Sequence, residues 1–150
     1  MSGKIRVATD LGEICLAFED ASLENRYYLD LKTGDIIFVS DFMDSAEIEE
    51  IEEKLDAELG KRYIAIPKIE PSEGYEDMED FIETVQDESL KEKLYIAIDG
   101  RGAFRRFKNV LCSYPEERER WFKFKNARVL ERVKEWLDAE GIEIIDTKTV

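Results

Sequence analysis

In the first half of the chain, hydrophobic positions form short runs that are rich in aromatic and β-branched residues. Such runs are typical of strands, and the clearest cover Arg26–Leu31 and Ile36–Ser40. The segment between them, Lys32–Asp35, predicts a tight turn because Gly34 accepts a positive φ. Arg62–Ile66 predicts a third strand. We therefore expect a small antiparallel sheet of about three strands with one clear hairpin.

Other hydrophobic positions of the same half recur with the helical period. Asp10 and Glu13 have the spacing of a capping box, which predicts the start of a first helix. The inward positions of this helix are Leu11, Ile14, Cys15 and Phe18. Ser45 is expected to cap a second helix, which ends at Gly60. The inward positions of the second helix are Ile48, Ile51, Leu55 and Leu59.

The helical period dominates the second half of the chain. Gly100 and Gly102 interrupt it once, between the second and third of four expected helices. These helices cover Tyr75–Val85, Ser89–Ile98, Ala103–Cys112 and Pro115–Glu140. Near the two ends, Ile5–Ala8 fits either a short edge strand or an ordered lead-in, and Ile142–Ile145 fits a fourth strand.

Together these elements predict an α+β fold, in which the small antiparallel sheet is packed with helices and followed by a mostly helical C-terminal half. The length of 150 residues suits one domain, and no repeat or low-complexity tract divides it. Within this domain we expect a sheet-bearing subdomain, 1–70, and a helical subdomain, 71–150.

The composition narrows the chemistry. The chain has no histidine, which excludes Ser-His-Asp and Cys-His nucleophile systems and removes the commonest transition-metal ligand. Its two cysteines, Cys15 and Cys112, form no CxxC motif, so a structural zinc site is not expected. They resemble buried small apolar side chains, although a disulfide between them stays open. We expect no cofactor, and the composition weighs against an enzyme.

No apolar stretch is long enough for a signal peptide or a membrane span. The sequence therefore predicts a cytoplasmic protein without a membrane partner.

Charge is distributed unevenly along the chain. The net charge is −14, but residues 1–99 hold 10 Lys and Arg against 27 Asp and Glu, whereas residues 100–150 hold 12 against 9. Such a basic region either binds anions at short range or docks onto the acidic part of the same fold.

The run 100–108 is the first candidate site. Two glycines before a helix allow close approach of a ligand, and arginines beside a helix start suit phosphate or carboxylate. The candidate anion-binding residues are Gly100, Arg101, Gly102, Arg105, Arg106 and Lys108. The structural alternative is that the glycines end and cap helices while the arginines pair with acidic neighbours.

A second candidate lies in the basic and aromatic segment 101–132. Aromatic rings that alternate with cations suit nucleic acid, because they stack on bases and follow phosphates. The candidate residues are Trp121, Phe122, Lys123, Lys125 and Arg128. The structural alternative is one aromatic face in the core, covered by the stems of basic residues.

A third candidate is an acidic helix face. Glu76, Asp80 and Glu83 share one face at i, i+4 and i+7, and oxygen ligands suit Mg²⁺. The structural alternative is a solvated acidic face, and on balance we expect no metal site.

Several motifs together resemble a known family. These are the run from Gly100 to Lys108, the pair Tyr114-Pro115, the segment Glu119–Phe122 and the segment Met78–Val85. They resemble the bacterial group catalogued as uncharacterised protein family 0158, most strongly over Tyr75–Leu137. The resemblance implies membership and no established activity.

Three functional hypotheses follow. The favoured one is a non-catalytic binding or regulatory module that recognises a protein partner or a small anion through the arginine run. The alternatives are a nucleic-acid-associated protein and a Mg²⁺-dependent enzyme acting on a phosphorylated substrate.

Overall fold

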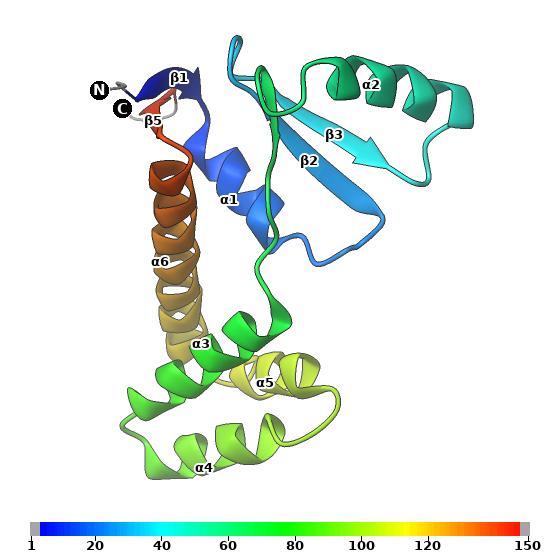
Figure 1. The fold of residues 1–150 in the computed structure, drawn as a ribbon. Coiled ribbons are helices and arrows are strands. Elements are labelled where there is room, and N and C mark those ends of the chain that lie inside the picture. Colours follow the sequence, from blue (N-terminus) through cyan, green and yellow to red (C-terminus); the bar gives the residue numbers. More distant parts are fainter. Residues whose placement is uncertain (1–3, 148–150) are drawn as a thin grey trace. The chain divides into compact units, whose positions relative to one another are not determined.

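A computed structural model describes residues 4–147, which fold into six helices and five strands (Figure 1). The elements in chain order are β1 (Ile5–Thr9), α1 (Leu11–Glu19), β2 (Asn25–Asp30), β3 (Ile36–Ser40), α2 (Ser45–Ala57), β4 (Tyr63–Ala65), α3 (Pro71–Glu83), α4 (Glu88–Ala97), α5 (Ala103–Leu111), α6 (Pro115–Ala139) and β5 (Ile142–Asp146). The fold is α+β, with a mostly helical C-terminal half, which confirms the predicted class.

The predicted three-stranded antiparallel sheet is present, with strand order β3-β2-β4. β2 and β3 form the expected hairpin, in which Asn25 lies opposite Ser40 and Leu29 opposite Ile36. Gly34 in its turn has a φ of +82°. A Cβ atom at Gly34 would lie 1.8 Å from the carbonyl oxygen of Ala8, so only glycine fits there.

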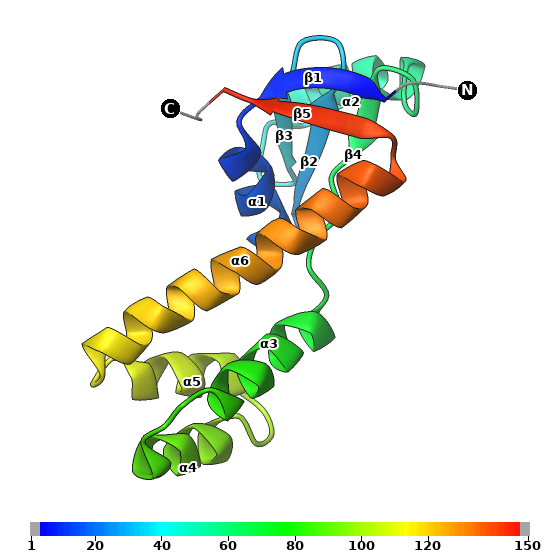
Figure 2. The same ribbon diagram turned by 90° about the vertical axis from the view of Figure 1, so that its left-hand side faces the viewer.

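The two segments near the chain ends pair with each other. β1 and β5 form a separate, parallel two-stranded sheet in which Ile5 lies opposite Ile142 and Thr9 opposite Asp146. Figure 2 shows the two strands side by side, β1 in blue and β5 in red. The sequence left Ile5–Ala8 open between a strand and a lead-in and suggested a strand at Ile142–Ile145, but it did not indicate that the two segments pair.

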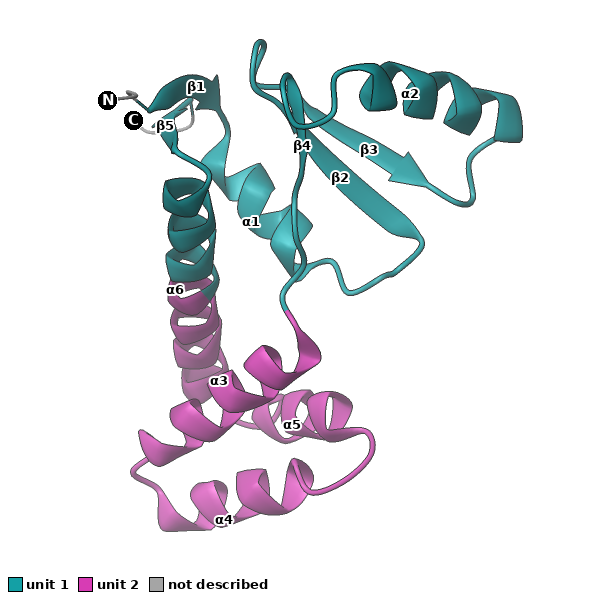
Figure 3. Cartoon of the chain, in the orientation of Figure 1, with its two compact units in different colours: residues 1–69, 129–150 teal, residues 70–128 magenta. Residues whose placement is uncertain are grey.

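The chain divides into two compact units (Figure 3). Unit 1 combines residues 1–69 with residues 129–150, and unit 2 is the continuous segment 70–128. α6 supplies side chains to both, because its residues 115–128 belong to unit 2 and its residues 129–139 to unit 1.

Each unit has its own hydrophobic core. The largest core cluster of unit 1 contains Val7, Ile14, Ala17, Phe18, Leu29, Ile66, Val129, Val133, Leu137 and Ile142. A smaller cluster between α2 and the antiparallel sheet contains Val39, Leu55 and Tyr63. The core of unit 2 contains Met78, Phe81, Ile82, Val85, Leu90, Leu94, Ile98, Ala103, Phe107, Leu111 and Trp121.

Helix starts follow local capping chemistry. The Asp10 side chain accepts from the backbone N–H of Gly12 and Glu13, as its spacing predicted. α2 differs from the expectation, because Asp44 and not Ser45 occupies its N-cap position. α3 begins at Pro71, four residues before the predicted start, since Glu70 and Glu73 form a reciprocal capping box around it.

Both cysteines are free. Cys15 is half-buried, and burial raises the pKa of its thiol. Cys112 is exposed, so the expectation of a buried side chain is wrong for this residue. It follows the last residue of α5, where a side chain on the outer face meets solvent. No helix among the described residues has the length and hydrophobicity that a bilayer crossing requires.

Candidate functional site

The turn between α4 and α5, in unit 2, carries the first candidate site. Gly100 and Gly102 have φ values of +82° and +75°, which side-chain-bearing residues rarely adopt. Gly102 is the N-cap residue of α5 and provides no capping side chain. The first turn of α5 also contains no acidic residue, so the partial positive charge of its N–H groups is not neutralised by a side chain of that turn.

The guanidinium of Arg106 donates hydrogen bonds to backbone carbonyls of this turn. Its Nε donates to the carbonyl oxygen of Ala97 at 2.8 Å and its Nη2 to that of Asp99 at 2.5 Å. Its Nη1 donates to the carbonyl oxygen of Arg101. These carbonyls lie at or just beyond the end of α4, where helical carbonyls lose their intrahelical partners. The Arg106 guanidinium therefore holds α4 and α5 together and faces backbone carbonyls.

Arg101 and Arg105 have no such partners. Both side chains are exposed, and among the residues that the structure describes neither makes a hydrogen bond, an ion pair or an aromatic contact. Each of the other eight arginines makes at least one of these interactions. Lys108, also exposed, stands three residues after Arg105 and so lies on the same side of α5.

Phe104, the second residue of α5, is 44% exposed. The buried face of α5 consists of Ala103, Phe107 and Leu111. One edge of the Phe104 ring lies against α3, because a Cβ atom at Gly74 would be 3.1 Å from its Cε1. The ring is therefore partly covered by α3 and does not belong to the core cluster of unit 2.

Two residues of the nucleic-acid candidate are structural. Trp121 is 5% exposed and lies edge-on to the rings of Phe81 and Phe107. Arg128 pairs with the carboxylates of Asp77 at 3.4 Å and Asp80 at 3.0 Å. This arrangement follows the structural alternative for these two positions.

The other three residues of that candidate lie at the surface of α6. Phe122 is half-buried, and cations lie over its ring, with distances to the ring centroid of 5.4 Å for Arg118 and 5.7 Å for Lys125. Lys123 is exposed. α6 thus carries a basic and aromatic flank, 118–125, within unit 2.

The acidic face of α3 is occupied by closed interactions. Asp80 pairs with Arg128, and Glu83 accepts from the hydroxyl of Tyr95 and lies 3.9 Å from Lys91 Nζ. Glu76 is exposed. Among the described residues, no three Asp, Glu or Cys side chains are grouped so that they could hold a metal ion.

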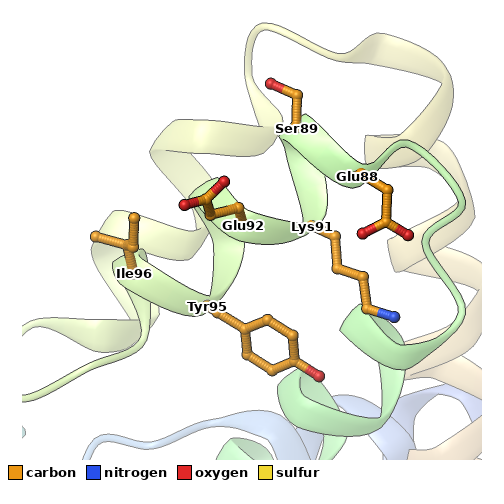
Figure 4. Close-up of a pocket in the computed structure, with 6 residues that line it drawn as sticks. All are labelled: Glu88, Ser89, Lys91, Glu92, Tyr95 and Ile96. Atoms are coloured by element: carbon orange, nitrogen blue, oxygen red, sulfur yellow. The ribbon is translucent and has the colours of Figure 1, made fainter.

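Sequence reasoning missed an open hollow on α4. Figure 4 shows its lining, which is Glu88, Ser89, Lys91, Glu92, Tyr95 and Ile96. Ile96 is 67% exposed because the buried positions of α4 are Leu90, Leu94 and Ala97. The sequence does contain a signal for this surface: Ile96 follows Leu94 by two positions and so falls outside the i, i+4, i+7 pattern of the buried residues.

The charges of unit 2 are divided between its two helical pairs. Residues 70–99, with α3 and α4, hold 2 Lys and Arg against 11 Asp and Glu. Residues 100–128, with α5 and the first half of α6, hold 9 against 3. The charge of unit 2 is therefore divided between an acidic segment, 70–99, and a basic segment, 100–128.

Comparison with known proteins places the chain in a family. The model of the Uncharacterised protein family (UPF0158) matches residues 7–149. A UPF0158 protein of Pseudomonas aeruginosa is 25% identical over 134 residues, which cover 89% of this chain and 84% of the relative.

Chlamydial relatives are longer than this chain. UPF0158 proteins of Chlamydia trachomatis and Chlamydia pneumoniae are each 31% identical over 122 residues, which are 81% of this chain but 37% of either relative. No solved structure matches the chain significantly. The family model covers nearly all of the described residues, and the chain belongs to the Uncharacterised protein family (UPF0158).

Proposed function

We propose that this protein is a non-catalytic binding module, in which unit 2 recognises an anionic group of a protein partner or a small ligand through Arg101, Arg105 and Lys108. Arg101 and Arg105 flank the start of α5, whose N–H groups favour negative charge, and Lys108 lies in the last turn of the same helix.

The observation that carries the proposal is the contrast among the arginines. The chain contains 36 Asp and Glu, and Arg101 and Arg105 are nevertheless the two arginines that are without a partner in the part of the chain that the structure describes. A guanidinium presents five N–H donors in a planar fork that matches carboxylate and phosphate groups. Two such forks beside an uncapped helix start therefore suit an anion from outside the chain.

Arg106 does not belong to this proposed surface, because each of its three guanidinium nitrogens already donates to a backbone carbonyl, those of Ala97, Asp99 and Arg101. A variant that tests the site must keep Arg106, since its loss would disturb the turn itself. Arg101→Glu/Arg105→Glu changes only exposed side chains.

The test compares this double variant with Lys54→Glu/Lys61→Glu. Lys54 and Lys61 are exposed cations of unit 1, so both variants change the net charge equally. We would titrate inorganic phosphate, pyrophosphate and citrate in a thermal-shift assay, and measure the anisotropy of a fluorescein-labelled oligoglutamate peptide. A ligand that binds the folded state raises its melting temperature.

We expect the wild-type protein and the lysine variant to bind at least one of these anions, and the arginine variant to lose that binding. Absence of binding by the wild-type protein, or an equal loss in the lysine variant, would exclude this site.

A nucleic-acid function is the second candidate, and the flank of α6 supports it. Phe122 lies between Arg118 and Lys125, and Lys123 is exposed beside it. Labelled single-stranded RNA in the same anisotropy assay separates the two candidates. Nucleic-acid binding should weaken steeply between about 50 and 200 mM salt, since bound phosphates release counterions. It should also weaken in Phe122→Ala, which leaves Arg101 and Arg105 unchanged.

A further inference from the structure

A groove follows α4 on the acidic side of unit 2. The hollow of Figure 4 adjoins a second one, which is lined by Tyr75, Glu79, Tyr95, Ile96, Ile98 and Asp99. The two hollows have Tyr95 and Ile96 in common, and together they are called the groove: the first is lined by α4 alone, and the second adds Tyr75 and Glu79 of α3.

The floor of this groove is apolar and exposed. Ile96 is 67% exposed, and Tyr95 is 38% exposed. The hydroxyl of Tyr95 donates to Glu83 of α3, which holds the ring in place in this floor. An exposed apolar strip with polar edges is typical of a protein-interaction surface.

The edges of the groove are acidic. Glu79, Glu88, Glu92 and Asp99 contribute four carboxylates to its lining. The lining contains one cation, Lys91, which lies 3.9 Å from Glu83 and is thereby neutralised. Glu88, Glu92 and Ile96 follow one another at intervals of four residues, so one helix face presents two carboxylates and an apolar side chain in line.

We propose that this groove docks a basic amphipathic segment of a protein partner, with apolar side chains on Tyr95 and Ile96 and lysines or arginines against Glu88 and Glu92. Charge complementarity selects such a segment, because a neutral apolar segment would leave the carboxylates unpaired and an acidic one would be repelled. The site differs from the proposed anion-binding surface in position, in charge and in partner.

The test uses a labelled amphipathic peptide of about 18 residues, with leucine at i, i+3, i+4 and i+7 and lysine elsewhere. A second peptide replaces every lysine by glutamate. We would measure fluorescence anisotropy with the full chain, and map the bound peptide by amide chemical shifts in NMR spectra.

Two pairs of variants locate the site. Glu92→Lys is matched by Glu49→Lys on α2, since both glutamates are exposed helical residues and both changes add the same charge. Ile96→Ser is matched by Leu23→Ser, because Leu23 is 85% exposed and lies in unit 1. Circular dichroism checks that each variant keeps its helices.

We expect the lysine peptide to shift the amides of α4, and its affinity to fall about ten-fold in Glu92→Lys and in Ile96→Ser. The two control variants should bind it like the wild-type protein. Equal losses in the controls, binding of the glutamate peptide, or no binding at all would overturn the proposal. A dimer in sedimentation equilibrium that the peptide dissociates would assign the groove to a second copy of this chain, and would overturn it as well.

Discussion

Arg105 and Arg106 are neighbouring arginines of α5 that differ in the hydrogen bonds of their guanidinium groups. Arg106 reaches three backbone carbonyls around the end of α4, whereas Arg105 is exposed and makes no contact of this kind within the described residues. The helical period predicts where a Cβ atom lies but not where the end of a long side chain lies, so sequence patterns do not distinguish the two arginines. The run 100–108 was identified from its composition, and its division into a structural and an exposed part required the fold.

We expect Arg106→Ala to lower the free energy of unfolding by about 1–3 kcal/mol, because hydrogen bonds from a charged donor are stronger than neutral ones. Urea unfolding followed by circular dichroism measures this change. Arg105→Ala is the matched control and should stay within about 0.5 kcal/mol of the wild-type protein. Equal losses in the two variants would contradict the assignment of Arg106 to the turn.

For Tyr63 we expect a substitution that does not lower the free energy of unfolding. Its ring is buried in the smaller core cluster of unit 1, and its hydroxyl has no hydrogen-bond partner among the described residues. A buried hydroxyl without a partner costs about 1–3 kcal/mol. Tyr63→Phe should therefore leave the free energy of unfolding unchanged or raise it by about 1 kcal/mol. A clear decrease in a urea titration would show that the hydroxyl is bonded in solution.

At the scale of elements, the hairpin of β2 and β3 depends on Gly34. Gly34 and Gly60 have nearly equal φ values, +82° and +84°, but only Gly34 lies against another backbone, that of Ala8 in β1. A Cβ atom at Gly60 would meet nothing within 4 Å. A substitution at Gly60 therefore measures the cost of a left-handed backbone conformation alone, whereas one at Gly34 adds the cost of a steric clash with Ala8.

We expect Gly60→Ala to cost about 1 kcal/mol, which is the conformational penalty alone. Gly34→Ala should cost about 3 kcal/mol or more, since either the turn or β1 must move. Thermal unfolding of the two variants gives the comparison. Similar melting temperatures would show that the hairpin turn is not packed against β1.

The elements were predictable where their causes are local. The hairpin between β2 and β3, the cap at Asp10 and the four helices of the second half all follow from short sequence patterns. The early start of α3 also has a local cause, the capping box of Glu70 and Glu73. The polar composition of this segment hid the helical pattern from the prediction. The pairing of β1 with β5 was not predictable, because the two strands are separated by nearly the whole chain.

At the scale of the whole molecule, two carboxylates connect stability to pH. Hydrogen bonds from Tyr27, Asn25 and Ser22 hold the pKa of Asp20 well below its usual range. Burial alone would raise the pKa of Asp30, but hydrogen bonds from Arg62 and from the turn after β2 outweigh it and hold this pKa low as well. Both carboxylates belong to unit 1.

Because both pKa values are lower in the folded state than in the unfolded chain, these groups stabilise unit 1 above about pH 4 and lose that effect as the pH falls below it. Urea unfolding at a series of pH values measures the change. We expect Asp20→Asn to be less stable than the wild-type protein at neutral pH, and the difference between them to shrink on acidification. A difference that stays constant with pH would contradict the role of the charged form.

The candidate sites show the same division between local and distant causes. Charge counts indicated a basic region after residue 100, and the structure places its exposed cations on α5 and α6. The burial of Trp121 and the ion pairs of Arg128 depend on α3, which meets these residues through Phe81, Asp77 and Asp80. The sequence of segment 118–128 allowed an aromatic face in the core, but it did not indicate which carboxylates would pair with Arg128.

The parallel pairing of β1 with β5 also bears on how the protein is made. Residues 142–146 leave the ribosome after every residue of unit 2. The helical segment 70–128 is then able to fold around its own core before β5 is available to pair with β1. Contacts between segments so far apart in the sequence also form slowly. Until β5 emerges, the nascent chain exposes the hydrophobic side chains of β1 and α1 that β5 and the end of α6 later cover. Unit 1 therefore completes its core only after β5 is synthesised, because Ile142 and Leu137 belong to that core.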